Sequence, residues 1–102
     1  MGKQMQIGCQ MAFNDFTSPK YIAEAAQFVE EFGFAEFWVP EHVMFFPTYE
    51  SKYPYSEDGR IGGEPRSLLD PFSALTFVAA NTRSIRLGTG ICLVPQRNPV
   101  YT

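Results

Sequence analysis

The residues of this sequence best suited to acid–base chemistry lie next to each other, at Glu41 and His42. They interrupt an apolar segment, FWVPEHVMFFP at residues 37–47, which also holds the only tryptophan and the only histidine of the chain. The imidazole of histidine exchanges a proton near neutral pH, and a neighbouring carboxylate can support that exchange. The pair therefore predicts a catalytic role for His42, with Glu41 supporting it. A structural histidine that hydrogen-bonds a loop carbonyl fits the same position equally well.

A cluster of aromatic residues follows this pair, in a long segment from Glu41 to Leu69 that is rich in proline and glycine. Loops of this length are uncommon in compact domains and usually serve as lids or binding loops. The aromatic side chains could form the wall of a pocket for a planar cofactor or an apolar substrate. They could instead form a small satellite core that holds the loop in place. The candidates for a lid or substrate wall are Tyr49, Tyr53 and Tyr55, next to Phe45 and Phe46.

Two glycines, Gly88 and Gly90, lie inside a further apolar run, SIRLGTGICLVP. Glycine weakens a strand, and it often marks a bulge or the close approach of a ligand. Tight packing against a neighbouring helix is the alternative explanation. With one histidine and no Cys-x-x-Cys spacing, the sequence contains no metal-binding motif.

Strands and helices alternate along the chain and would position these residues. Apolar alternation or short apolar runs predict strands at residues 5–11, 35–40 and 84–95. Ser18-Pro19 and Asp70-Pro71 each combine an N-cap residue with proline at the first helical position, and Asn98-Pro99 offers the same opening a third time. Gly33 predicts the end of the first helix. The buried face of the second helix is predicted to contain Phe72, Leu75, Thr76 and Ala79.

This order predicts an α/β fold with parallel strands joined by right-handed crossovers. An open doubly wound sheet that binds a dinucleotide would need G-x-G-x-x-G after the first strand, where the sequence has FNDFTSP instead. The other candidate is a TIM-like (β/α)8 barrel, which typically needs about 250 residues. We therefore expect residues 1–102 to form part of a single domain, namely the first βαβαβ portion of such a barrel. The chain would then be a fragment of a larger protein.

The charge and composition exclude several kinds of partner. The net charge is −3 and no basic patch is present, so we expect neither nucleic acid nor an anionic membrane as a partner. No apolar run approaches the roughly 18 residues of a membrane span. The N-terminal segment MGKQMQIG lacks the apolar core of a signal peptide, which predicts a cytoplasmic protein. Cys9 and Cys92 are expected to be free thiols, because a strand would lie between them.

Four segments of the sequence resemble the N-terminal part of the luciferase-like monooxygenase family, especially its branch that uses the deazaflavin cofactor F420. They are the strand IGCQM with its capped helix ending in EEFGF, the step FWVPEHV, the loop YESKYPYSEDGR, and IRLGTGICLVPQRNPV. They occur in family order and span nearly the whole chain. The last two are the most specific.

The resemblance implies an oxidoreductase that transfers hydride between F420, or alternatively FMN, and a small organic substrate. In the family's F420 enzymes an acidic residue followed by histidine contacts the cofactor ring, which maps onto Glu41 and His42, although the acid is more often aspartate. The family also places a non-prolyl cis peptide behind the ring, which maps onto Gly90-Ile91 as further cofactor-binding residues. Phosphate contacts come largely from later strands. The rival functions are an FMN- and O₂-dependent monooxygenase and a non-catalytic subunit, and a homodimer is expected for the full-length protein.

Overall fold

The computed structural model describes residues 4–61 and 67–101 of the chain. Strand β1 (Gly8–Gln10) leads through helix α1 (Pro19–Glu31) to strand β2 (Glu36–Val39). A long loop then precedes helix α2 (Pro71–Asn81), strand β3 (Arg86–Thr89) and the short 3₁₀ helix η1 (Val94–Gln96). The predicted order of strand, helix, strand, long loop, helix and strand is confirmed. Part of the predicted loop, residues 62–66, lies outside the described residues.

Both helices begin at the predicted cap residues. The Ser18 hydroxyl accepts a hydrogen bond from the Tyr21 N–H at 3.2 Å, and the Asp70 carboxylate accepts one from the Ser73 N–H at 2.9 Å. These bonds satisfy backbone donors that have no partner inside the first turn. Gly33, with φ of 90°, ends α1 in the left-handed region that glycine adopts without strain.

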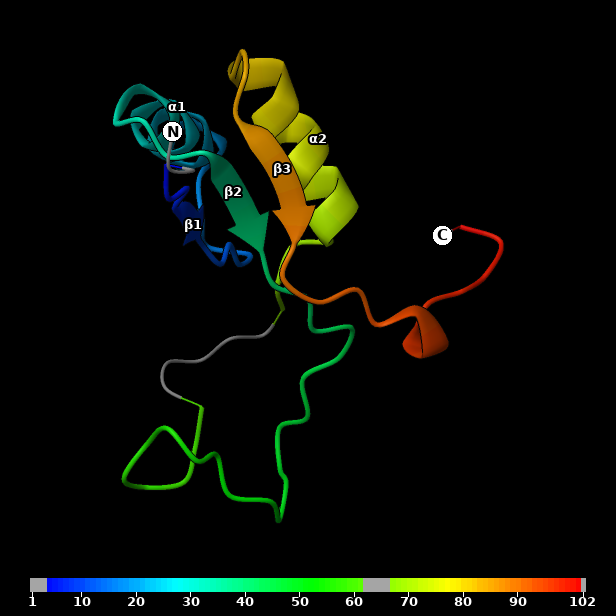
Figure 1. Ribbon diagram of the computed structural model, residues 1–102. Helices are drawn as coiled ribbons and strands as arrows, with labels where there is room; N and C mark the ends of the chain where they lie inside the picture. The colour runs from blue at the N-terminus through cyan, green and yellow to red at the C-terminus, as the bar shows by residue number, and fades with distance from the viewer. Residues whose placement is uncertain (1–3, 62–66, 102) are drawn as a thin grey trace.

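The three strands form one parallel sheet in the order β1-β2-β3, in which Phe37 of β2 lies between Cys9 of β1 and Leu87 of β3. In Figure 1 the three arrows point the same way, and the loop between β2 and α2 extends beyond the edge at which the strands end. Residues from both helices pack with Phe37 and Val39 of β2 in one core. That core consists of Phe13, Ile22, Ala26, Val29, Phe37, Val39, Ala74 and Val78.

The arrangement of the strands and helices agrees with the predicted (β/α)8 barrel. The order of the strands follows the chain without reversal, and both helices cover the same face. Successive right-handed crossovers produce this arrangement at the start of a (β/α)8 barrel, where every helix lies outside the sheet. The first half of a doubly wound sheet shares it, because the strand order of that fold reverses only after the third strand.

The opposite face of the sheet is dominated by Trp38, whose ring lies over two glycines. A Cβ built on Gly88 would lie 2.5 Å from the ring, and one built on Gly8 would lie 2.9 Å from its Nε1. The indole N–H donates to the Glu36 carboxylate at 3.1 Å, and Glu36 pairs with Arg86 at 2.7 Å. Gly88 therefore has a packing role, and its neighbour is a tryptophan rather than a helix.

Three sequence predictions need correction. Strand β3 is shorter than predicted, because it ends at Thr89 and the chain bends at Gly90. The peptide bonds of the described residues are all trans, so the prediction of a cis bond at Gly90-Ile91 is wrong, while the predicted loss of regular strand geometry there is confirmed. The predicted buried face of α2 is wrong in part, because Phe72, Thr76 and Ala79 are exposed while Ala74 and Val78 are buried. At Asn98-Pro99 the described residues form a turn, in which the Val100 N–H donates to the Asn98 side chain at 2.9 Å, and the helix opening there stays a prediction.

Two further features agree with the sequence. Cys9 and Cys92 are both free, as predicted. Among the described residues, no helix has the length and apolar character needed to cross a bilayer.

Candidate functional site

The candidate site lies at the edge of the sheet where the parallel strands end. There the Gly90 N–H donates to the Val39 carbonyl at 2.7 Å, which joins the segments that follow β2 and β3. The Leu69 N–H donates to the Phe13 carbonyl at 2.9 Å, which joins the segment after β1 to the start of α2. Residues distant in sequence therefore meet at the edge where catalytic groups of α/β barrels collect.

Glu41 is the one buried charged residue among the described part of the chain, with 3% of its surface exposed. One carboxylate oxygen accepts a hydrogen bond from the Leu93 N–H at 2.5 Å, and the other pairs with the Arg97 guanidinium. Both oxygens thus bind the segment that follows β3. A buried charge requires such partners, because removing it from water is otherwise costly.

Arg97 links Glu41 to the start of α2. Its side chain is 14% exposed, and it donates to the Asp70 carboxylate at 2.7 Å while its guanidinium lies 4.8 Å from the centre of the Phe72 ring. The hydrogen bond to Asp70 raises the pKa of Arg97 above its ordinary value, against the effect of burial and with a further contribution from Glu41. The cation is therefore fixed between two carboxylates.

Asp70 has two roles in this network, as N-cap of α2 and as partner of Arg97. Partial burial raises the pKa of Asp70, but hydrogen bonds from the Ser73 N–H and the Arg97 guanidinium outweigh it and hold the pKa below its ordinary value. The carboxylate form is thus favoured at neutral pH. The network anchors the segment after β3 to both β2 and α2.

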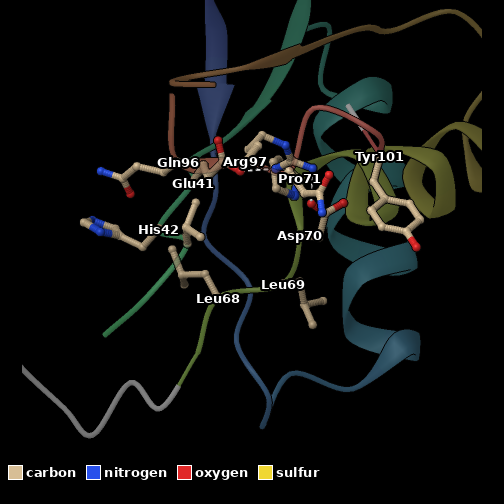
Figure 2. Close-up of a pocket in the computed structure, with 11 residues that line it drawn as sticks. Glu41, His42, Leu68, Leu69, Asp70, Pro71, Gln96, Arg97 and Tyr101 are labelled. Atoms are coloured by element: carbon tan, nitrogen blue, oxygen red, sulfur yellow. Dashed lines mark hydrogen bonds and ion pairs between the residues drawn. The ribbon is translucent and has the colours of Figure 1, made fainter. Parts of the chain in front are cut away.

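His42 is exposed, in contrast to its neighbour Glu41. Its ring lies 4.9 Å from that of Phe45, and within the described residues no hydrogen bond holds either ring nitrogen. Figure 2 shows the imidazole projecting to the side opposite Asp70, so that it lies outside the ion-pair network. The alternative of a histidine bound to a loop carbonyl therefore finds no support in the described part of the chain.

His42 lines two cavities. The first has a volume of about 270 Å³ and includes the ion-pair network in its wall. Its lining residues are Glu41, His42, Val43, Leu68, Leu69, Asp70, Pro71, Gln96, Arg97, Asn98 and Tyr101. The second has a volume of about 690 Å³ and is formed mainly by the loop after β2. Its lining residues are His42, Val43, Met44, Phe45, Phe46, Tyr49, Ser51, Ile61, Leu93 and Gln96.

The three tyrosines of the loop are separated by the structure. Tyr49 lines the 690 Å³ cavity together with His42, and its hydroxyl accepts a hydrogen bond from the Ile61 N–H at 2.9 Å. Tyr53 and Tyr55 line neither cavity, and they contact each other edge to face with ring centres 5.4 Å apart. Of the three, Tyr49 alone is thus placed beside His42.

Gly90 and Ile91 line neither cavity, although they lie at the same edge of the sheet. A Cβ built on Gly90 would meet only the Gln10 side-chain amide, at an ordinary contact distance of 3.5 Å. Ile91 is 55% exposed. Gly90 is exposed as well, so the backbone is accessible to solvent at this edge. No group of three or more His, Cys, Asp or Glu within the described ranges is arranged to hold a metal ion.

A family model described as luciferase-like monooxygenase matches residues 4–102 of this chain. The chain belongs to the luciferase-like monooxygenase family. Two uncharacterized proteins, Rv0953c of Mycobacterium tuberculosis (strain ATCC 25618 / H37Rv) and Mb0978c of Mycobacterium bovis (strain ATCC BAA-935 / AF2122/97), are each 33% identical to it over 88 residues. The matched region covers 83% of this chain and 31% of each relative, so the chain spans about a third of their length. No solved structure matches the chain significantly.

The luciferase-like family explains why the site is incomplete in these residues. A flavin or deazaflavin needs a flat apolar surface for its ring and donors for its phosphates. The open backbone at Gly90 with the exposed Ile91 fits the first need. Arg97 is already paired with Glu41 and Asp70, so it does not offer a free cation to a phosphate.

Two residues of this site, Arg97 and Asp70, were not predicted from the sequence as site residues. Asp70 was identified only as a helix cap, and Arg97, the one charged residue of the segment after β3, was given no role. One signal could have identified them. Glu41 follows an apolar strand, so its carboxylate is predicted to lie at a buried edge of the sheet. A buried carboxylate requires a cation as its partner. Arg97 follows the neighbouring strand and is the cation available at that edge.

Proposed function

We propose that this chain supplies the first part of a barrel oxidoreductase that transfers hydride between F420 and a small organic substrate. The observation that carries the proposal is the position of His42, exposed at the carboxyl end of β2, beside two cavities and near the open backbone of Gly90. When bound, F420 or FMN would supply the hydride chemistry. Family membership supports this class of cofactor.

In this proposal His42 is the catalytic residue. It gives a proton to the substrate or takes one from it, because its imidazole is exposed to both cavities and held by no hydrogen bond in the described residues. Glu41 is a positioning residue rather than a direct participant. Both of its oxygens are engaged by the Leu93 N–H and Arg97, so it fixes the segment after β3 relative to His42.

Gly90 and Ile91 would hold the cofactor ring, with the glycine leaving space and the isoleucine presenting an apolar surface. Tyr49 would form part of the wall of the substrate site. Tyr53 and Tyr55, further along the same loop, would belong to a lid over that site. We further propose that the complete protein is a homodimer, which sedimentation velocity of the purified protein would test.

The cofactor is tested by titrating the purified product of the longest reading frame that contains these residues with F420 and, separately, with FMN. We expect saturable binding of F420, followed by its fluorescence, and weaker binding of FMN. Tight binding of FMN with oxygen consumption would instead support the monooxygenase. Binding of neither cofactor would support a non-catalytic subunit.

The role of His42 is tested in the same protein by His42→Ala and His42→Asn. Positioned acid–base groups typically contribute about 10²- to 10⁴-fold to turnover. We expect both variants to lose turnover by that order and to keep their melting temperature, because the side chain is exposed. Unchanged turnover with a lower melting temperature would assign His42 to structure.

A further inference from the structure

The larger of the two cavities beside His42 differs in chemistry from the smaller one. The wall of the smaller cavity contains the charges of Glu41, Asp70 and Arg97. None of the residues that line the 690 Å³ cavity is Asp, Glu, Lys or Arg. Its volume lies within the range of about 300–1,000 Å³ that is usual for small-molecule sites.

Aromatic side chains and a thioether dominate the wall of the larger cavity. Phe45, Phe46 and Tyr49 provide the rings, and Met44 provides the sulfur. Aromatic rings attract other rings in offset or edge-to-face geometry, and a thioether makes favourable contacts with ring edges. A wall of this composition favours a flat aromatic ligand over a saturated one of equal size.

The polar groups of the cavity are few and uncharged apart from His42 itself. They come from Ser51, Gln96 and the hydroxyl of Tyr49, whose oxygen already accepts the Ile61 N–H. Such groups can orient one carbonyl or hydroxyl group but cannot neutralise a carboxylate or phosphate. An anionic ligand would lose part of its hydration there without gaining an ion pair, which is unfavourable.

We propose that the 690 Å³ cavity binds the substrate, and that the substrate is an uncharged aromatic molecule carrying a carbonyl or hydroxyl group. The hydride transfer in this inference rests on the proposed function, whereas the binding of an aromatic molecule in the cavity does not. In the reducing direction a bound reduced cofactor would supply hydride to the carbonyl carbon, and His42 in its protonated form would give a proton to the oxygen, which yields an alcohol, an oxidised cofactor and a neutral imidazole. Figure 2 shows His42 and Gln96, which both line this cavity, projecting to the same side.

The test of binding uses the 102-residue chain without cofactor, and follows backbone and side-chain NMR shifts on addition of defined probes. The probes are 2-acetylnaphthalene, its saturated analogue 2-acetyldecalin, and the charged analogue 6-acetyl-2-naphthoate. We expect 2-acetylnaphthalene to shift the signals of His42, Met44 and Tyr49. Loss of the aromatic contacts should weaken binding of the saturated analogue about two- to thirteen-fold. The carboxylate should weaken binding by at least about tenfold.

Phe46→Ala and Phe16→Ala form a matched pair of variants. Both phenylalanines are well exposed, at 64% and 69%, so neither change removes core packing, but only Phe46 lines the cavity. Phe46→Ala should weaken binding of 2-acetylnaphthalene about two- to thirteen-fold, and Phe16→Ala should leave it unchanged. Equal or tighter binding of the carboxylate, equal binding of the decalin, or shifts confined to other residues would overturn the proposal.

A second measurement separates this inference from the proposed function. The product of the longest reading frame is assayed for cofactor-dependent reduction of 2-acetylnaphthalene. Specific binding without turnover would refute the assigned hydride transfer and leave the cavity assignment standing. Cofactor-dependent turnover of charged substrates, without binding of the aromatic ketone, would refute the cavity assignment and leave the oxidoreductase standing.

Discussion

The two glycines at the end of β3 should respond in opposite ways to replacement by alanine. A Cβ at position 88 would lie 2.5 Å from the Trp38 ring, whereas one at position 90 would lie 3.5 Å from the Gln10 amide. Carbon atoms pack favourably at about 3.5–4.0 Å, so Gly88→Ala creates an overlap of about 1 Å and Gly90→Ala creates none. Neither glycine has a positive φ, so alanine adopts both backbone conformations.

The expected size follows from two opposing effects. Replacing glycine by alanine at a compatible backbone position stabilises by about 0.4–1 kcal/mol, because the unfolded chain loses freedom. Overpacking costs typically about 1–3 kcal/mol, and it dominates at Gly88 because Trp38 is also held by Glu36 at 3.1 Å. We therefore expect Gly88→Ala to lower the free energy of unfolding by about 1–2 kcal/mol and Gly90→Ala to leave it unchanged or slightly raised.

The assay uses the intrinsic fluorescence of Trp38, the only tryptophan of the chain, during urea unfolding. Each 1 kcal/mol corresponds to a shift of about 0.3–1 M in the urea midpoint, because the slope for small proteins is about 1–3 kcal/mol per M. In Gly88→Ala the folded-state emission should also move to longer wavelength, because the displaced ring gains contact with water. Equal stability of the two variants, with unchanged emission, would refute the packing of Trp38 over Gly88. In the longest reading frame, Gly90→Ala should weaken cofactor binding without loss of stability.

Three further predictions concern the elements that hold the site. Hydrogen bonds from the backbone N–H groups of Ser84 and Ile85, and from Arg83, hold the pKa of Glu30 below its ordinary value of 4.5. The stability that the Glu30 carboxylate contributes is thus fully present above pH 4.5 and is lost as the pH falls below that value. Acid unfolding curves should therefore show the wild type losing stability below pH 4.5, and the Glu30→Gln variant losing less. Glu41→Ala leaves the half-buried Leu93 N–H without its acceptor, and urea unfolding should show a loss of at least about 1–3 kcal/mol. Ser18→Ala removes the cap of α1 and should cost about 0.5–2 kcal/mol by thermal circular dichroism, whereas Ser18→Asp should retain most of the stability.

The features predicted correctly from the sequence are those that depend on neighbouring residues. A Ser-Pro or Asp-Pro pair contains both the cap and the first helical residue, so the starts of α1 and α2 follow from two positions each. The free cysteines had a different basis, because they followed from the strand order that the alternation of elements predicted. For the helix starts local chemistry was sufficient, because no distant partner decides the outcome.

The buried face of α2 shows where periodicity fails. The sequence predicted Phe72 and Thr76 on that face, but both are exposed, and the buried residues include Ala74 and Val78. Most residues of this helix are apolar, so the pattern does not select one face. The choice is made by packing: small side chains allow α2 to approach the sheet closely, while Phe72 is placed beside Arg97.

The ion-pair network could not be predicted from local patterns either, because Arg97 is separated from Glu41 by 56 positions and from Asp70 by 27. A barrel topology brings the ends of β2 and β3 together, but local patterns do not show that the loop after β3 turns back so that its one charged residue, Arg97, reaches both Glu41 and Asp70. Two of the three charges had visible local explanations, as a helix cap and as a catalytic partner of His42. Because each of these two carboxylates already had a local explanation, the sequence did not indicate that both also pair with Arg97.

The different roles of Glu41 and His42 follow from the geometry of the strand that precedes them. Successive side chains of an extended chain point to opposite faces. Phe37 and Val39 are buried against the helices, and Glu41 continues this alternation past Pro40 with 3% of its surface exposed. His42, the next residue, is exposed and takes no part in the ion pair of Glu41.

This alternation is why two adjacent ionisable residues can interrupt an apolar segment without conflict. The acid lies on the helix side, where Arg97 and the Leu93 N–H compensate its burial. The imidazole is exposed beside both cavities, and its described contact is with the Phe45 ring. A shift of one residue in the length of β2 would exchange the two environments, placing the imidazole against Arg97 and exposing the carboxylate. The position of Pro40, where β2 has ended, therefore places Glu41 in the ion-pair network and leaves His42 exposed.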